Sequence, residues 1–363
     1  MNGSLSIVFI GLSITSSWGN GHATTYRALI KGLSQEGHQV LFLERDVPYY
    51  AENRDMPDPD FCEVGLYTSL GDMFARFGTR IASADAVIVG SYVPEGADLL
   101  SRLIGTGTRP LGFYDIDTPV TLAALDRGER HYLAPDQIPR LDVYFSFSGG
   151  EVLDHLEQVR GARRAEALYC AADTDLHAPA RNGAMRWDLG YLGTYSDDRQ
   201  PTLDALLLEP ARCLPEKRFV VAGPMYPDAI DWPDNVERIE HLPPPRHPAF
   251  YSAQRFTLNV TRSDMKRMGW SPSVRLFEAA ACGTPVISDS WRGLHEIFPE
   301  GQAILTASSS EDVIAALSEV SDETATEIGR NARNLVLRHH SGRARARQLA
   351  GVLESLTADV AEN

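Results

Sequence analysis

The chain has 363 residues, of which 43% are hydrophobic and 23% are charged. This length predicts about two domains, and the composition is that of a globular protein. The 34 basic and 49 acidic residues give a net charge of −15, which argues against nucleic acid or an anionic membrane as a general partner. No run of about 18 apolar residues occurs, so we expect no transmembrane segment.

The four cysteines, Cys62, Cys170, Cys213 and Cys282, have no C-x-x-C spacing and form no Cys/His pattern typical of zinc. The N-terminus also lacks the basic start and the long apolar run of a signal peptide. These observations predict reduced thiols in a cytoplasmic protein.

Strands alternate with helices in the first part of the chain. A helix is expected at residues 24–35, where apolar positions share one face and Gly37 ends the helix. Buried strands are expected at 5–11, 39–44, 85–90, 110–114 and 141–147. This alternation predicts a parallel sheet with helices on both faces.

A polar loop at residues 16–25, reading SSWGNGHATT, links the first strand to the first helix. Gly19 and Gly21 allow the backbone to approach a phosphate at the helix N-terminus, although a plain loop with a threonine cap fits the same pattern. His22 suits an acid/base role near neutral pH, and a structural histidine is the alternative.

Two acidic residues, Asp115 and Asp117, stand at the end of the strand at 110–114. In extended chain they would point to the same side, and one of them would orient His22 as a carboxylate orients an imidazole in a catalytic triad. The alternatives are contact with an acceptor hydroxyl, or capping by Asp117 of a helix that begins near Pro119. His22, Asp115 and Asp117 are therefore the candidate catalytic residues.

The alternation restarts after residues 168–179. Strands are expected at 189–193, 218–223, 256–260 and 284–288, a loop at the Pro-rich run 242–248, and helices from residue 310 onward. The sequence thus predicts an α/β protein with two Rossmann-like parallel-sheet domains, 1–172 and 173–340, facing a cleft. A C-terminal helix at 341–363 is expected to pack back on the N-terminal domain.

Candidate donor-binding residues lie in this second half. Gly193 and Thr194 follow a predicted strand, and ligands of such sheets bind at the carboxyl ends of the strands. Arg199 is the preferred partner for a phosphate, followed by Arg275 and Arg262, because a guanidinium matches phosphate oxygens with its fork of donors. A surface ion pair is the alternative for each arginine.

Glu278 lies on a predicted helix just before a glycine turn. A carboxylate held there can accept hydrogen bonds from two neighbouring hydroxyls, such as those of a ribose. The alternative is a solvated glutamate in an ordinary helix–turn–strand unit.

Several of these segments resemble GT-B glycosyltransferases. Residues 273–289, SVRLFEAAACGTPVISD, closely resemble the motif that holds the donor nucleotide in that family. Residues 190–199 resemble its cation-bearing strand-end loop, and 168–179 its interdomain hinge. Residues 21–38 are similar to the first loop and helix of inverting members, whose Gly-His loop supplies the base. Nearly the whole chain resembles family 4 of this group and its spore-maturation-like subfamily.

The resemblance implies a hexosyltransferase that moves a sugar from a nucleotide-diphosphate donor to an acceptor hydroxyl, without a metal or a cofactor. It suggests a UDP-sugar, and it leaves open whether the acceptor is a small molecule, a glycan, a lipid-linked sugar or a protein. Family 4 carries a second glutamate eight residues before the one matching Glu278, where this chain has Trp270. This departure leaves the stereochemistry of transfer open.

Other functions fit parts of the pattern. A catalytically degenerate binding module would explain Trp270, and a nucleotide-sugar epimerase shares the two-domain architecture. A nicotinamide-dependent dehydrogenase would use Glu44 to hold a ribose, but G-x-G-x-x-G is absent because its third glycine position is Thr24.

Overall fold

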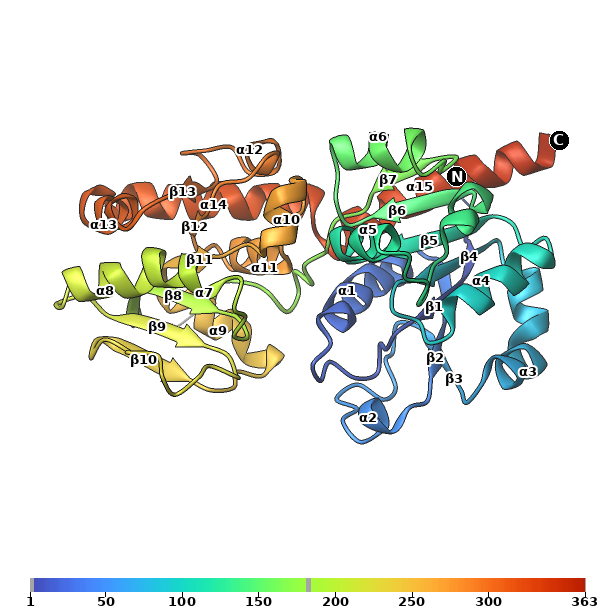
Figure 1. Cartoon of the computed structure of the whole chain (residues 1–363), viewed down its shortest axis with the longest axis horizontal. Coiled ribbons are helices and arrows are strands. Elements are labelled where there is room, and N and C mark those ends of the chain that lie inside the picture. The colour runs from blue at the N-terminus through green and yellow to red at the C-terminus, as the bar shows by residue number, and fades with distance from the viewer. Residues whose placement is uncertain (1–2, 181–183, 363) are drawn as a thin grey trace. The chain divides into compact units, whose positions relative to one another are not determined.

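The computed structural model describes residues 3–180 and 184–362. The chain forms two compact units (Figure 1). The N-terminal unit comprises the residues up to Ala171 together with those from His340 onward, and the C-terminal unit comprises Ala172–His339.

The N-terminal unit is built on a parallel sheet. Within the described residues this sheet has seven strands in the order β3-β2-β1-β4-β5-β6-β7. The strands are β1 Ser6–Gly11, β2 Gln39–Arg45, β3 Glu63–Tyr67, β4 Ala86–Gly90, β5 Leu111–Asp115, β6 Val143–Ser146 and β7 Ala165–Ala167. Figure 1 shows helices on both faces of this sheet. They are α1 Gly21–Gln35, α2 Pro48–Ala51, α3 Leu70–Ser83, α4 Gly96–Gly105, α5 Thr118–Asp126, η1 Pro135–Arg140, α6 Glu151–Gln158 and α15 Gly342–Glu362.

The C-terminal helix α15 belongs to the N-terminal unit, where it packs on α1. Leu349 and Leu353 of α15 join Leu29 and Leu33 of α1 in one buried core. The two backbones touch closely, because a Cβ on Gly32 would lie 2.3 Å from the carbonyl oxygen of Gly342. Glycine at this crossing is therefore a requirement of packing.

Gly342→Ala should destabilise the protein, since the added Cβ would lie 2.0 Å from the Ala28 carbonyl oxygen. Overpacking of this kind costs about 1–3 kcal/mol. Gly351→Ala on the same helix is the control: no heavy atom lies within 4 Å of its Cβ, and the better helix former should add about 0.5–1 kcal/mol. Urea unfolding followed by circular dichroism compares the two. Equal stability of Gly342→Ala and the parent would contradict the close approach.

The C-terminal unit has a second parallel sheet. In residues 172–180 and 184–339 it contains six strands in the order β10-β9-β8-β11-β12-β13. They are β8 Trp187–Leu192, β9 Phe219–Ala222, β10 Val236–Ile239, β11 Gln254–Asn259, β12 Val286–Ser288 and β13 Leu305–Thr306. Its helices are α7 Gln200–Leu203, η2 Asp204–Leu208, α8 Glu209–Cys213, η3 Pro244–Arg246, α9 His247–Ser252, α10 Ser263–Met268, α11 Val274–Ala281, α12 Leu294–Ile297, α13 Ser310–Glu319 and α14 Asp322–His339.

The prediction of two α/β domains with parallel sheets is confirmed. Two local predictions are wrong. The helix expected at 24–35 begins at Gly21, so His22 lies in its first turn and not in a loop. The Pro-rich run at 242–248 is only partly a loop, since η3 and the start of α9 occupy its second half. Proline is tolerated there because the backbone N–H groups in the first turn of a helix have no partner within the helix, so the N–H that proline lacks is not needed.

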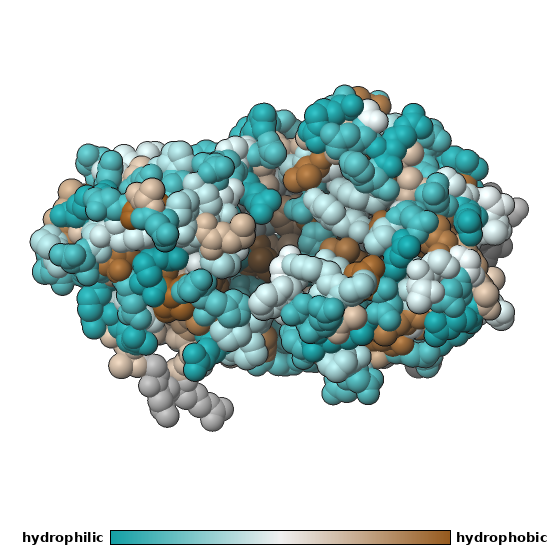
Figure 2. Space-filling view, turned by 60° about the horizontal axis from the view of Figure 1, so that its bottom comes forward, coloured by the Kyte–Doolittle hydropathy of each residue, from teal (hydrophilic) through white to brown (hydrophobic). Residues whose placement is uncertain are grey.

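No helix in the described residues combines the length and the apolar character needed to cross a bilayer. Hydrophilic side chains cover most of the face seen in Figure 2.

Candidate active site

His22 is fixed at the N-terminus of α1, close to the carboxyl end of β1. Asn20 occupies the N-cap position, and its Oδ1 accepts a hydrogen bond from the His22 backbone N–H at 3.1 Å. Asparagine, and not a threonine, therefore caps this helix. Gly19 has φ +59°, and a Cβ there would lie 2.7 Å from the Tyr49 hydroxyl, so the turn requires glycine. Gly21 has open space around its Cβ position.

The imidazole of His22 faces Asp117. Its Nε2 lies 3.3 Å from Asp117 Oδ2, with 13% and 33% of the two side chains exposed. A carboxylate acceptor at Nε2 favours the proton on that nitrogen. Nδ1 is buried and has no hydrogen-bond partner among the described residues. His22 is thus fixed with Nε2 toward Asp117.

The two aspartates do not share a direction, contrary to the prediction. β5 ends at Asp115 and the chain then turns into α5, so Asp117 lies at the N-cap position of that helix. Its side chain makes no capping hydrogen bond, which excludes the capping alternative in this structure. Of the two aspartates, Asp117 is the one that faces His22.

Asp115 is completely buried beneath this pair. Its Oδ2 accepts a hydrogen bond from the Tyr144 hydroxyl at 2.5 Å, and its Oδ1 accepts from the Thr121 hydroxyl at 2.7 Å and from the Asp117 backbone N–H at 3.3 Å. Burial raises the pKa of Asp115 to about 6, although the Tyr144 and Thr121 bonds oppose the shift. Asp115 therefore holds the backbone of Asp117, and its own carboxylate is enclosed by the fold.

Tyr92 is a neighbour of His22 that the sequence did not reveal. Its ring lies 5.2 Å from that of His22, edge to face, and its backbone adopts φ 64°. Burial raises the pKa of Tyr92, and the negative charge of Asp117 raises it further. The available signal was its place directly after Gly90 and Ser91, at the carboxyl end of β4.

Glu44 holds the loop after β1 through hydrogen bonds to Ile14 and Thr15. Its Oε2 accepts hydrogen bonds from the backbone N–H groups of Ile14 and Thr15 at 2.8 and 3.1 Å, and its Oε1 accepts from the Thr15 hydroxyl at 2.6 Å. The side chain is completely buried. Because its carboxylate is used internally, Glu44 does not hold a ribose as the dehydrogenase alternative requires.

The three predicted arginines gather at the carboxyl edge of the second sheet. Arg275, 9% exposed on α11, donates from Nε to the Leu192 carbonyl at 2.5 Å and from Nη1 to Asn259 Oδ1 at 2.9 Å. Arg199 donates from Nη2 to the Thr194 carbonyl at 2.7 Å. Arg262 is exposed and precedes α10. In the described part of the chain, none of the three forms an ion pair with a carboxylate.

Their charges act on one another. Burial lowers the pKa of Arg199, and the positive charges of Arg275 and Arg262 lower it further. Arg199 Nε is buried and has no hydrogen-bond partner within the described residues. Like charges held this close, with a donor unused, favour binding of an anion.

Two glycines bring the strand ends together beside these arginines. A Cβ on Gly193 would lie 2.9 Å from Arg275 Nη2, and one on Gly223, where φ is +140°, would lie 2.1 Å from the Gly193 carbonyl oxygen. Tyr226 donates a hydrogen bond from its hydroxyl to the same carbonyl at 3.0 Å. Thr194 is exposed at this edge.

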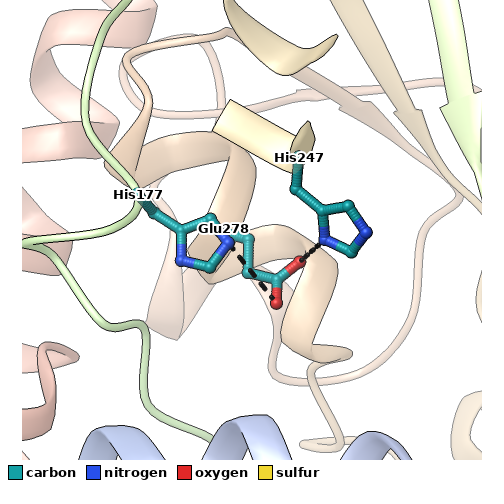
Figure 3. Close-up of side chains that lie close together, drawn as sticks. All are labelled: His177, His247 and Glu278. Atoms are coloured by element: carbon teal, nitrogen blue, oxygen red, sulfur yellow. Dashed lines mark ion pairs between the residues drawn. The ribbon is translucent and has the colours of Figure 1, made fainter. Parts of the chain in front are cut away.

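Glu278 lies in a cluster with two histidines that the sequence analysis did not single out (Figure 3). Its side chain is only 7% exposed, and its oxygens face His177 Nε2 at 3.7 Å and His247 Nδ1 at 3.8 Å. Burial alone would raise the pKa of Glu278, but His177, His247 and Arg275 outweigh it and the pKa lies below its ordinary value. A ribose contact by Glu278 remains a prediction.

The expected independence from metal stays a prediction, although the fold brings three possible metal ligands together in the described residues. His177, His247 and Glu278 each offer one ligand atom, and these atoms lie within 4.8 Å of one another. No pattern in the sequence indicated the cluster, because its members come from three segments that are 70 and 31 residues apart.

Comparisons with known proteins agree with the two-domain parallel-sheet fold. Residues 199–351 match the family model described as glycosyl transferase-like. Sucrose-phosphate synthase from Thermosynechococcus elongatus superimposes with a TM-score of 0.69 at 15% identity, covering 98% of this chain and 100% of that one. Anabaena HepE in complex with UDP-glucose gives 0.66 at 16% identity, covering 97% and 100%. The predicted GT-B fold and the resemblance to glycosyltransferases are therefore confirmed.

The prediction that nucleic acid is not a partner stays untested. An α-glucosyltransferase in complex with UDP-glucose and DNA superimposes with a TM-score of 0.67 at 12% identity, covering 97% of this chain and 100% of that one. Proteins of this fold thus include one that contacts DNA.

Proposed function

We propose that this GT-B protein is a glycosyltransferase that moves a hexose from a nucleotide-diphosphate donor to an acceptor hydroxyl. The observation that carries the proposal is the group of Arg199, Arg262 and Arg275 at the carboxyl ends of β8 and β11, which makes no close ion pair with a carboxylate of the described residues. A diphosphate is the anion whose shape and charge such a group of guanidinium donors suits best.

The arginines would stabilise the departing diphosphate as its bond to the anomeric carbon breaks. They supply positive charge to the phosphate oxygens, so the proposed reaction needs neither a cofactor nor a metal ion at the diphosphate. UDP is the proposed nucleotide, since the Anabaena protein of the same fold was solved with UDP-glucose.

On the N-terminal unit, His22 would take the proton of the acceptor hydroxyl while the acceptor oxygen bonds to the anomeric carbon. Asp117, 3.3 Å from Nε2, would stabilise the resulting imidazolium. Tyr92 covers the imidazole edge and would restrict access of water.

A ligand screen tests the proposal. UDP and UDP-sugars should raise the unfolding temperature, because a ligand at 100 times its dissociation constant adds about 2.7 kcal/mol. NAD at the same concentration is the control. If none of the nucleoside diphosphates and nucleotide sugars stabilises the protein, the proposed donor site is contradicted.

Product analysis of the same samples separates the remaining alternatives. Release of UDP with transfer or slow hydrolysis of the sugar supports the transferase. Conversion of the donor into an isomeric sugar nucleotide would indicate an epimerase. Binding with no product at all would indicate a degenerate binding module.

A further inference from the structure

We propose that His177, His247 and Glu278 form a binding site for a divalent metal ion of the zinc class. This inference goes beyond the proposed function, which assigns the diphosphate to arginines and requires no metal.

The three side chains converge from separate segments of the C-terminal unit. His177 precedes β8 and is 1% exposed, His247 begins α9, and Glu278 lies in the middle of α11. Glu278 Oε1 faces His177 Nε2 and Oε2 faces His247 Nδ1, as Figure 3 shows. Tyr251 adds a long contact, with its hydroxyl 3.4 Å from Oε2.

The opposite ring nitrogens decide where the imidazole protons lie. His177 Nδ1 is 3.2 Å from the carbonyl oxygen of Asp173, and His247 Nε2 is 3.2 Å from the carbonyl oxygen of Leu242. A carbonyl only accepts hydrogen bonds, so each of these nitrogens carries the hydrogen. In a neutral imidazole the nitrogen that faces Glu278 then presents a lone pair.

With neutral imidazoles, the two ring nitrogens that face Glu278 therefore present lone pairs, and the Tyr251 hydroxyl, 3.4 Å from Oε2, is only a distant donor to the carboxylate. His177 Nε2 and His247 Nδ1 are both buried without a hydrogen-bond partner among the described residues. Their distances of 3.7 and 3.8 Å from the carboxylate exceed hydrogen-bond range. Buried acceptors that face one another are unfavourable unless a cation satisfies them.

A transition-metal cation matches this set of ligands. Two imidazoles and one glutamate form a known zinc ligand set that leaves one coordination position open. Histidines that bind metal usually donate their other N–H to a carboxylate or a backbone carbonyl, as both histidines do here. A bound ion would tie the segment after Ala172 to α9 and α11.

Metal titration of the full chain, without a histidine tag, tests the site. After removal of metal by a chelator, the parent should bind one Co²⁺ per chain with visible absorption bands of nitrogen ligation, and Zn²⁺ should displace it. Glu278→Gln and His247→Gln should bind at least about 10-fold more weakly. His295→Gln is the matched control, since His295 also faces a glutamate, Glu300 at 3.1 Å, but is 49% exposed.

The readout is independent of sugar transfer, so failure of the transferase proposal leaves this test intact. If the parent shows no Co²⁺ spectrum at one ion per chain, the proposed site is overturned, whatever the variants do. If the parent and both cluster variants bind the metal equally, the ion is adventitious and lies elsewhere, and the proposed site is overturned. His247→Gln also separates the predicted ribose role of Glu278 from metal ligation: it should lose the metal and retain nucleotide affinity if the carboxylate meets the ribose directly.

Discussion

His22→Ala should slow sugar transfer by about 10²–10⁴-fold and leave nucleotide affinity unchanged. The reason is geometric: His22 Nε2 is held by Asp117 at 3.3 Å, and Nδ1 has no other partner in the described part of the chain. Removing the imidazole removes the proposed proton acceptor, but it leaves the arginine group of the other unit intact. Initial rates of UDP release at saturating donor, together with calorimetry of UDP binding, measure the two quantities separately.

His131→Ala is the matched control for this substitution. His131 lies in the same unit and also faces a carboxylate, Glu129 at 3.2 Å, but its side chain is 71% exposed. Asp117→Asn should slow transfer as well, because an amide no longer stabilises an imidazolium. If His22 is the base, NMR of the product should show inversion at the anomeric carbon. Transfer by His22→Ala at the parent rate would make this histidine structural.

Arg199→Ala should reduce the turnover number by about 10²–10³-fold, the usual loss when one donor to a developing negative charge is removed. Arg199 is half-buried, its Nε has no hydrogen-bond partner among the described residues, and the positive charges of Arg275 and Arg262 act on it. Arg199→Lys should recover part of the loss, since an ammonium keeps the charge but lacks the fork of donors. Steady-state kinetics with saturating donor and calorimetry with UDP distinguish a loss of turnover from a loss of binding.

Arg267→Ala provides the comparison for Arg199→Ala. Arg267 lies in the same unit, pairs with Asp264 on α10 and is 75% exposed, so its removal should change neither quantity. If Arg199→Ala has the same turnover and UDP affinity as Arg267→Ala, Arg199 does not belong to the donor site. The diphosphate would then have to be held by Arg275 and Arg262.

The sequence by itself determined the central strands of both sheets. Strands such as β1, β2, β4 and β9 are buried on both faces, so their apolar runs are nearly continuous and visible without a structure. The helical end of the chain was visible in the same way. Arg199 and Arg262 follow predicted strand ends, and Arg275 lies on the predicted helix that carries Glu278, so all three could be named as candidates from the sequence.

The strands that the sequence analysis missed lie at the edges of the sheets. They are β3 and β7 in the first sheet and β10 and β13 in the second. Their sequences, EVGLY, AEA, VERI and LT, are short and include half-exposed or polar positions. An edge strand has one neighbour and needs less apolar surface, so its local signal is weak.

Only the tertiary structure decided the fine assignment of the site residues. The sequence left Asp115 and Asp117 equivalent, and the turn from β5 into α5 buried the first and directed the second to His22. His177 and His247 had no pattern in common with Glu278, since residues from distant segments meet only when α9 and α11 pack in one unit. Local periodicity records which residues a strand or helix buries, whereas the direction of one side chain depends on neighbours that are remote in the chain.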